Sequence, residues 1–311
     1  MKELSKIAMR VNPSTTLAID SLAKQMKADG LDVISFGTGE PDFMTPENIS
    51  EAGIAAIREG KTKYTPAAGI VQLRKAAAER LKADCGLDYD YTQIVIASGA
   101  KHNVYAALRV LLDPGDEVIV PAPYWVSYCE MVSICGGVPV VVETAEAAGF
   151  KMAPAQLEAA ITPRTKALIL NNPSNPTGMV YTEAELRAIA EVCVKYDLYV
   201  IADEIYYKLM YDGKPFVSFA SLGGDVKERT IVVNGVSKSY AITGWRLGYS
   251  ASNREIARLI GNYLSHSTGA PSTIPPWAAV EALSGQKAPI EDIPKVLEEP
   301  RTYLVTRMNP N

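Results

Sequence analysis

The stretch Val236-Ser-Lys-Ser-Tyr-Ala-Ile-Thr-Gly-Trp-Arg-Leu-Gly-Tyr249 decides how this chain is interpreted. It follows the apolar run 230–234, which predicts a β-strand, and it carries Lys238 and Arg246. A lysine there can form an imine with a carbonyl cofactor, and an arginine can hold a phosphate through two parallel hydrogen bonds. Because lysines are common in loops, the pair predicts a cofactor site only if its other parts occur elsewhere in the chain.

The composition is that of a globular protein with a large core. The chain has 311 residues, 48% of them hydrophobic and 21% charged, which suits one large domain with a smaller second domain. A net charge of -4 argues against nucleic-acid binding. The sequence contains neither a long apolar run nor an apolar segment after its first charges, which argues against a membrane span and a secretory signal. We expect a cytoplasmic protein without nucleic-acid or membrane partners.

The few cysteines and histidines argue against a metal site. Cys85, Cys129, Cys135 and Cys193 show no metal-binding spacing, and there are only two histidines. We expect buried free thiols and no bound metal.

Short apolar runs alternate with helical patterns along most of the chain. This alternation predicts an α/β fold with a mostly parallel central sheet flanked by helices. The predicted strands are residues 93–97, 117–120, 138–142, 167–170, 198–202, 230–233 and 247–250. The predicted helices include residues 17–26, 104–112 and 183–194, the last beginning after Thr182 with Glu185 placed for a capping box.

The two ends of the chain differ from its middle. The glycine- and proline-rich residues 34–42 predict an irregular segment that lies against another surface, with a ligand as one candidate. Residues 289–308 predict a helix interrupted by Pro294 and Pro300, with apolar side chains near its end and no later element to cover them. This ending leads us to expect a truncated chain.

Polar residues follow several predicted strands, at the sheet edge where ligands bind in open α/β folds. Asp203 ends the strand 198–202, and Tyr206 comes three residues later. The carboxylate could pair with the protonated ring nitrogen of a pyridine cofactor, and Tyr206 could hydrogen-bond a phenolate oxygen of that ring. Alternatively, Asp203 caps a helix that begins at Ile205, and Tyr206 packs in the core.

A second group of residues could hold a phosphate and a ring. Ser98-Gly-Ala-Lys101 precedes a helix, so it is either a phosphate seat or an ordinary strand-to-helix turn. Lys101 could neutralise the phosphate, bind an acidic substrate or remain in solvent. Trp125 could stack on a planar cofactor or belong to the core. Asn175 could donate to a ring oxygen or form a local turn, and its bond to Pro176 is a candidate cis peptide.

Taken together, these segments resemble the pyridoxal-phosphate-dependent aspartate aminotransferase family, which has fold type I and comprises class I and II aminotransferases, and in particular its bacterial branch. The similarity runs in the family's order over about residues 10–285. The matching segments are Gly37-Thr-Gly-Glu-Pro-Asp-Phe43, Tyr64-Thr-Pro-Ala-Ala-Gly69, Ser98-Gly-Ala-Lys101, Pro123-Tyr-Trp125, Asn172-Pro-Ser-Asn-Pro-Thr-Gly178, Ala202-Asp-Glu-Ile-Tyr206 and Ser237-Lys-Ser-Tyr-Ala-Ile-Thr-Gly-Trp-Arg246.

The resemblance implies a role for each of these positions. The catalytic residues would be Lys238, as the lysine that forms the Schiff base, with Asp203 at the pyridine nitrogen and Tyr206 at the phenolate oxygen. The residues implied to bind the cofactor are Gly99, Ala100, Lys101, Trp125, Asn175, Asp203, Tyr206, Ser237, Lys238 and Arg246, together with Tyr64 from the neighbouring subunit of a homodimer. The residues implied to bind substrate are Gly39, Ser14, Thr16, Lys101, Trp125 and Asn175; Ser14, Thr16 and Lys101 would recognise a dicarboxylic side chain.

The implied activity is transfer of an amino group between an amino acid and a 2-oxo acid by a ping-pong mechanism. Aspartate and glutamate are the expected amino acids, and prephenate is a further candidate. Two departures from the family are Gly235, where many relatives have a serine, and the lack of a later segment with the arginine that binds the substrate α-carboxylate. Three alternatives remain: a carbon–sulfur β-lyase, a non-catalytic cofactor-binding module, and an inactive fragment that still binds pyridoxal phosphate.

The resemblance also implies a division into domains. Residues 1–45 would form an N-terminal arm and part of a small domain, and residues 46–285 the large cofactor-binding domain. Residues 286–311 would be the interdomain helix and the start of the rest of the small domain.

Overall fold

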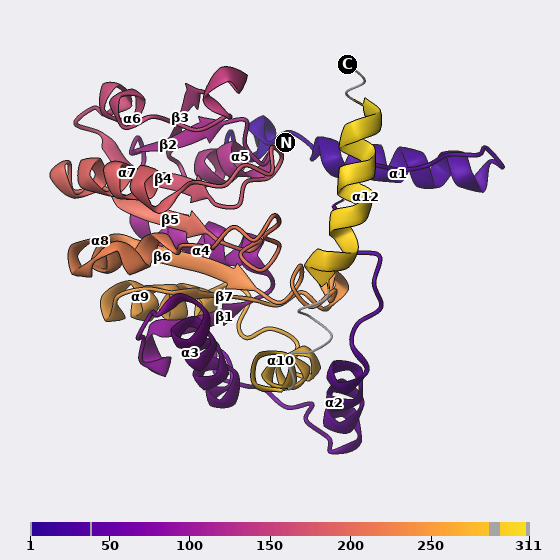
Figure 1. Cartoon of the computed structure of the whole chain (residues 1–311). Coiled ribbons are helices and arrows are strands. Elements are labelled where there is room, and N and C mark those ends of the chain that lie inside the picture. The colour runs from indigo at the N-terminus through magenta and orange to yellow at the C-terminus, as the bar shows by residue number, and fades with distance from the viewer. Residues whose placement is uncertain (1, 38, 286–292, 309–311) are drawn as a thin grey trace.

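The computed structural model describes residues 2–37, 39–285 and 293–308 and is built around one seven-stranded sheet (Figure 1). The strands are β1 (Ile94–Ala97), β2 (Glu117–Ala122), β3 (Val138–Glu143), β4 (Thr165–Asn171), β5 (Tyr199–Asp203), β6 (Thr230–Gly235) and β7 (Gly248–Ala251). Their order is β1-β7-β6-β5-β4-β2-β3. All neighbours pair in parallel except β7, which is antiparallel to β1 and β6. The predicted strands and the mostly parallel sheet are confirmed.

Helices cover both faces of this sheet. The helices are α1 (Thr15–Ala28), α2 (Glu47–Arg58), α3 (Val71–Cys85), α4 (Ala100–Leu111), α5 (Ser127–Ile134), α6 (Pro154–Ala160), α7 (Glu183–Lys195), α8 (Gly224–Arg229), α9 (Arg254–His266), α10 (Ile274–Ser284) and α12 (Ile293–Met308). Alternate residues of β4 pack on opposite sides. Ala167 and Ile169 join the cluster formed with α4, α5 and α9, whereas Leu168 and Leu170 join the one formed with α6 and α7. Burial on both faces explains why a central strand such as β4 reads as a continuous apolar run.

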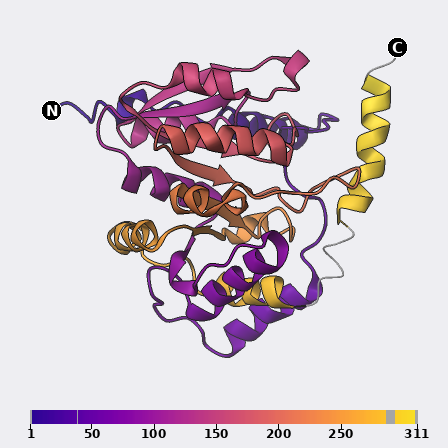
Figure 2. The same ribbon diagram turned by 60° about the vertical axis from the view of Figure 1, so that its left-hand side comes forward.

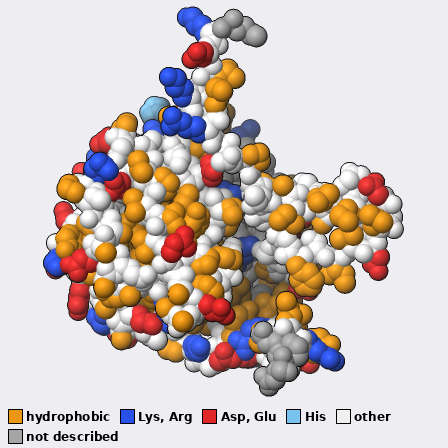
Figure 3. Space-filling view, turned by 90° about the horizontal axis from the view of Figure 1, so that it is seen from above, with side chains coloured by type: hydrophobic (Ala, Val, Ile, Leu, Met, Phe, Trp, Pro, Cys, Tyr) orange, Lys and Arg blue, Asp and Glu red, His pale blue; other side chains and the backbone are white. Residues whose placement is uncertain are grey.

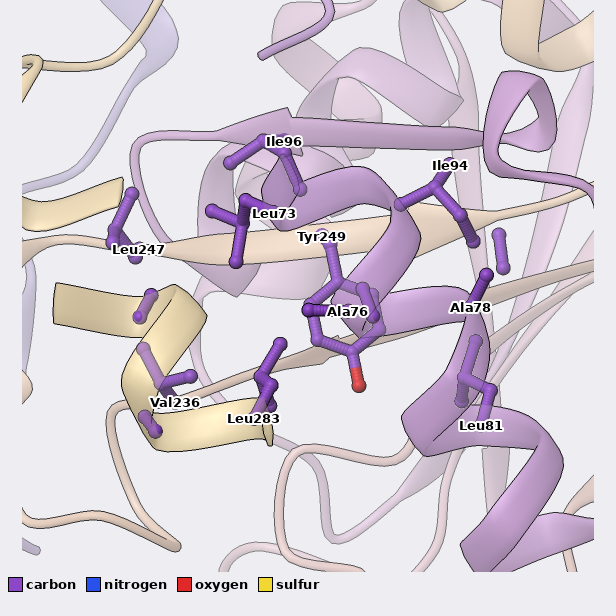
Figure 4. Packing of buried hydrophobic residues seen from close by; sticks show 14 of the residues in the cluster. Leu73, Ala76, Ala78, Leu81, Ile94, Ile96, Val236, Leu247, Tyr249 and Leu283 are labelled. Carbon is purple, nitrogen blue, oxygen red and sulfur yellow. The ribbon is translucent and has the colours of Figure 1, made fainter. Parts of the chain in front are cut away.

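A third apolar cluster holds α3 and α10 against the β1 side of the sheet. Figure 4 shows Leu73 and Leu81 of α3 and Leu283 of α10 gathered with Ile94 and Tyr249 of the sheet. Tyr249 is 2% exposed, so its ring is part of the core. This cluster fixes the edge of the sheet from which α4 begins.

The capping box predicted for α7 is confirmed. The Thr182 hydroxyl accepts a hydrogen bond from the Glu185 backbone N–H, and the Glu185 carboxylate accepts one from the Thr182 backbone N–H. These contacts satisfy donors that a helix N-terminus leaves unpaired.

One alternative interpretation and one prediction about helices are wrong. Residues after Asp203 form a turn rather than a helix beginning at Ile205. The helix expected to break at Pro300 runs through it as α12, because one proline removes one backbone donor and the remaining bonds of an exposed helix persist. Residues 289–292 of that prediction lie outside the described residues.

The N-terminal helix α1 projects from the body of the molecule in Figure 1, whereas in the turned view of Figure 2 it lies behind the body. Leu17, Ile19 and Leu22 are exposed, and α1 buries Ala23 alone. Figure 3, seen from above, shows apolar side chains along this protruding arm. The helix is therefore not held by a core of its own within the described part of one chain.

Two further observations concern the described residues as a whole. No helix among them is long and apolar enough to cross a bilayer. The four cysteines are free thiols, and Cys135 and Cys193 are buried whereas Cys85 and Cys129 are half-buried. The domain boundaries at residues 45 and 285 stay a prediction.

Candidate functional site

The predicted site residues gather at the carboxyl ends of β4, β5 and β6, beside the turn that joins β1 to α4. Asn171 and Asp203 are the last residues of β4 and β5 and are paired in the sheet. Lys238 follows β6 on the loop that returns through Arg246 to β7. Parallel strands carry their polar ends to one edge, which is where open α/β sheets bind ligands.

Asp203 is held in a fixed position by several contacts. The side chain is 4% exposed, and its two oxygens accept hydrogen bonds from the Tyr128 hydroxyl at 2.8 Å and the Ile205 backbone N–H at 3.3 Å. The Asn171 side chain donates to the Asp203 backbone oxygen at 2.8 Å. Burial raises the pKa of Asp203 to about 6, against the lowering effect of the two hydrogen bonds to its carboxylate.

Tyr206 and Asn175 lie together, as the sequence predicts for partners of one ring oxygen. The Asn175 side-chain amide donates to the Tyr206 hydroxyl at 3.3 Å. The Asn175 backbone N–H donates to the Asn171 side chain at 2.7 Å, which fixes the loop after β4. The Asn175–Pro176 peptide is cis, as predicted. Burial raises the pKa of Tyr206, so its hydroxyl keeps its proton at neutral pH.

Lys238 lies between Tyr206 and the N-terminal segment 34–42. Its Nζ is 6.0 Å from the centre of the Tyr206 ring and donates a hydrogen bond to the Gly39 carbonyl oxygen. Burial lowers the pKa of Lys238; Glu40 opposes that shift and Arg246 adds to it. A lowered pKa favours the neutral, nucleophilic amine. The irregular segment lies against Lys238, in agreement with its predicted contact with another surface.

The turn from β1 to α4 forms a close-fitting cradle with Arg246. Gly99 has φ of 92°, and a Cβ atom at this position would lie 2.5 Å from Nη2 of Arg246. A Cβ at Gly248 would lie 2.3 Å from the Ala100 backbone nitrogen, so β7 also presses on the turn. Free backbone N–H groups at the start of α4 and a guanidinium beside them are a suitable arrangement for an anion such as phosphate.

Lys101 and Trp125 extend the site along α4 and α5. Nζ of Lys101 lies 4.8 Å from the centre of the Trp125 ring. Lys101 also lines a cavity with Ser98 and Arg246, so it faces the cradle. Trp125 is half-buried, with its ring edge-on to Tyr128 at 5.3 Å between centres. Ser237 is buried beside Lys238.

Three predicted residues lie away from this group. Ser14 caps α1 by accepting a hydrogen bond from the Leu17 backbone N–H, and Thr16 lies on the same projecting helix. Within the described residues, no hydrogen bond or ion pair joins either side chain to the surroundings of Lys238. Tyr64 is fully exposed on the loop between α2 and α3.

Two contacting residues were not among the predicted site residues. Tyr128 contacts Asp203 directly, and Asn171 fixes both Asp203 and Asn175. Tyr128 is an aromatic residue in an apolar helical pattern, so its sequence context indicates core packing alone. Asn171 lies in the amide-rich stretch after a strand, which was a usable signal for it.

The donor set fits pyridoxal phosphate. A buried carboxylate, a lysine with a lowered pKa, a phenol with an amide and an aromatic ring surround one edge of the sheet. The cradle at Gly99 admits no side chain and has a guanidinium beside it. This combination can hold a phosphorylated, ring-nitrogen-containing aldehyde and can move a proton through Lys238.

The sequence of this chain is similar to those of known aminotransferases. A sequence model of the family described as "Aminotransferase class I and II" matches residues 31–310. The aspartate aminotransferase of Bacillus subtilis (strain 168) is 48% identical over 296 residues, which are 95% of this chain and 75% of that protein. A probable aspartate/prephenate aminotransferase of Rhizobium leguminosarum bv. phaseoli is 44% identical, over 99% of this chain and 78% of that one.

The fold is also similar to solved structures. The aspartate aminotransferase of Thermus thermophilus with maleate has a TM-score of 0.92 and 42% identity, over 95% of this chain and 77% of that chain. The aspartate aminotransferase of Rhizobium meliloti has a TM-score of 0.94 and 40% identity, over 99% of this chain and 77% of that chain.

Proposed function

Because the chain belongs to the class I and II aminotransferase family, we propose that it uses pyridoxal phosphate to transfer an amino group between aspartate or glutamate and a 2-oxo acid. The observation that carries the proposal is the convergence of Lys238, Asp203 and Arg246 at one edge of the sheet, beside the Gly99 cradle. The names of the relatives, which include aspartate and aspartate/prephenate aminotransferases, support the choice of a dicarboxylic or related substrate.

Each part of the site has a definite task in this proposal. When bound, pyridoxal phosphate withdraws electrons from the α-carbon of the amino acid. The proposed holding residues are Gly99, Ala100, Ser237 and Arg246 for the phosphate, Asp203 for the ring nitrogen, Tyr206 and Asn175 for the phenolate oxygen, and Trp125 for the ring face. The Asp203 carboxylate keeps the ring nitrogen protonated, because an opposite charge favours the charged form of its partner.

Lys238 is proposed to act twice. Its amine would hold the cofactor covalently at the aldehyde carbon, with loss of water, and once freed by the substrate's amino group it would remove the α-proton as general base and return it as general acid. The lowered pKa of Lys238 supports both tasks, because a free amine is needed for each. The Tyr206 hydroxyl, kept protonated by burial, donates to the ring oxygen.

The substrate and a second subunit complete the proposal. Lys101, with Ser14 and Thr16 on α1, would bind the side-chain carboxylate, and Gly39 would contact the substrate carboxylate. A homodimer, which is typical of the family, would bring Tyr64 of one subunit to the phosphate of the other. Tyr64 is fully exposed, and Leu17, Ile19 and Leu22 on α1 are more than half exposed, which is consistent with such an assembly.

Borohydride trapping tests the central assignment. Reduction of the cofactor-loaded protein should attach the cofactor to Lys238, and peptide mapping should find it there. Lys238→Ala should lose transfer from aspartate to 2-oxoglutarate by about 10²–10⁴-fold or more, whereas Lys214→Ala, at an exposed lysine outside the site, should retain it. Cofactor attached to another lysine would contradict the assignment of Lys238. Pyruvate release from cystathionine without amino transfer would instead indicate a β-lyase.

A further inference from the structure

Tyr128 is a fully buried side chain in direct contact with the central carboxylate of the site. Its hydroxyl donates to Oδ2 of Asp203 at 2.8 Å, and the side chain is 2% exposed. Its ring meets Trp125 edge-on, with an interplanar angle of 86°. Trp125 lies just before α5 and Tyr128 lies in its first turn, so one short segment supplies both the contact to the carboxylate and the proposed ring-stacking residue.

The direction of this hydrogen bond is fixed by chemistry. Burial and the neighbouring Asp203 hold the pKa of Tyr128 well above its usual value, so the phenol stays protonated. An ionised carboxylate can only accept, which makes Tyr128 the donor. The other oxygen of Asp203 accepts from the Ile205 backbone N–H at the longer distance of 3.3 Å. The other titratable groups facing Asp203 are Tyr206 and Glu204, and burial raises the pKa of both.

We propose that Tyr128 is a positioning residue that stabilises the ionised form of Asp203 and fixes the direction of its carboxylate toward the cofactor's ring nitrogen. The inference rests on the proposed function, because it assigns Asp203 to that nitrogen. Packing alone does not require a hydroxyl here, since a buried phenol without a partner would be costly and a phenylalanine would fill the same volume.

Tyr128→Phe tests the proposal, because it removes one oxygen and keeps the ring against Trp125. Loss of a charge-assisted hydrogen bond should raise the Asp203 pKa by about one unit or more. This shift can be measured by NMR of carboxyl-labelled, cofactor-free protein, with the resonance assigned by Asp203→Asn. The cofactor dissociation constant, measured by reconstitution of the full chain, should increase about 10-fold.

A double-mutant cycle separates positioning from a general structural role. In the Asp203→Asn background, Tyr128→Phe should change cofactor affinity by less than about 2-fold, because its partner charge is gone. An equal loss of affinity in both backgrounds would overturn the proposal. This comparison does not depend on how much Tyr128→Phe lowers overall stability.

The matched control is Tyr124→Phe. The Tyr124 hydroxyl bonds to the Cys129 thiol and not to Asp203, so removing it should leave the Asp203 pKa unchanged. If wild-type protein takes up no cofactor on Lys238, the proposed function fails. If it does so and Tyr128→Phe shifts neither the Asp203 pKa nor cofactor affinity, only this inference fails.

Discussion

Gly99 is constrained in two ways at once. Its backbone has φ of 92°, and the space that a Cβ would need is filled by the Arg246 guanidinium. Gly115 has a similar φ of 95° but open space around it. Substitutions at the two glycines can therefore distinguish the cost of backbone strain, which both would have, from a clash with Arg246, which only Gly99 would have.

Gly99→Ala should weaken cofactor binding at least about 10-fold, because the methyl group displaces Arg246, whereas Gly115→Ala should leave binding unchanged. Both variants should lose roughly 1–3 kcal/mol of folding stability from strain. Cofactor titration followed by absorbance, together with urea unfolding, measures the two effects. Equal loss of cofactor affinity in both variants would contradict the proposed cradle.

The raised pKa of Asp203 predicts how stability depends on pH. Burial raises this pKa from 3.8 to about 6, so the folded protein binds the proton more tightly than the unfolded chain does. Stability of the cofactor-free protein should fall as pH rises from about 4 to 6, by on the order of 3 kcal/mol from this group, and stay level above.

Asp203→Asn should remove that contribution. Because burial raises the pKa of the neighbouring Glu204 to about 8 in the wild-type protein, the measurement is the difference between wild-type and variant unfolding free energies at pH values below that range. The variant should gain relative stability between about pH 4 and 6. Parallel stability curves would show that Asp203 does not titrate in this range.

Several residues of the site were predictable from sequence because each follows a recognisable strand. Asn175 and Tyr206 lie within hydrogen-bonding distance, and Lys238 lies near the Tyr206 ring, whereas their roles toward a cofactor stay a prediction. Tyr128 was not predictable, because its contact with Asp203 depends on how α5 packs across the sheet and not on local pattern. Ser14 could not be placed at the site in one chain, since α1 projects away from it.

At the scale of elements, α12 is attached to the loop that follows Tyr206. Arg301 binds both carboxylate oxygens of Asp212, at 2.6 and 3.0 Å, and its guanidinium lies 4.9 Å from the centre of the Tyr211 ring. Glu298 accepts a hydrogen bond from the Asp212 backbone N–H at 3.2 Å. The loop and the helix therefore share one polar contact area, on the segment that follows the proposed phenolate partner in the sequence.

Arg301→Ala should make the loop that contains Asp212 more mobile. Backbone amides of residues 207–214 should exchange faster with deuterium, because the bidentate contact that orders Asp212 is lost. Arg307→Ala is the control, since its guanidinium contacts Tyr303 on the same helix. Hydrogen exchange measured by mass spectrometry distinguishes them, and unchanged exchange in both variants would refute the attachment.

Elements were predicted well where burial fixes their pattern and less well where it does not. The central strands β4 and β5 are buried on both faces, so they were evident from their apolar composition. The antiparallel direction of β7 was not predicted, because a strand's direction depends on its tertiary connections. The exposed helix α12 contains Pro300, and local rules overestimate the effect of proline where few neighbours are disturbed.

At the scale of the whole molecule, the proposed dimer can be tested through shared sites. Tyr64→Phe and Lys238→Ala should each lower the aminotransferase activity of a homodimer. The first would remove a contact to the cofactor phosphate, and the second would remove the amine that moves the proton. Mixing the two variants under exchange conditions should restore activity, because one site of the mixed dimer has both residues intact. Activity no higher than the sum of the separate variants would argue that Tyr64 acts within its own chain.

The position of β7 has a consequence for how the chain folds during its synthesis on the ribosome. β1 lies at the edge of the sheet and pairs with β7, which is translated about 150 residues later and so on the order of ten seconds later. Until then the nascent chain holds Gly99 without the guanidinium of Arg246. Stalled nascent chains of increasing length should therefore begin to capture pyridoxal phosphate only after β7 has emerged from the exit tunnel. Capture by chains that end before residue 246 would show that the cradle at Gly99 binds the cofactor without the Arg246 guanidinium.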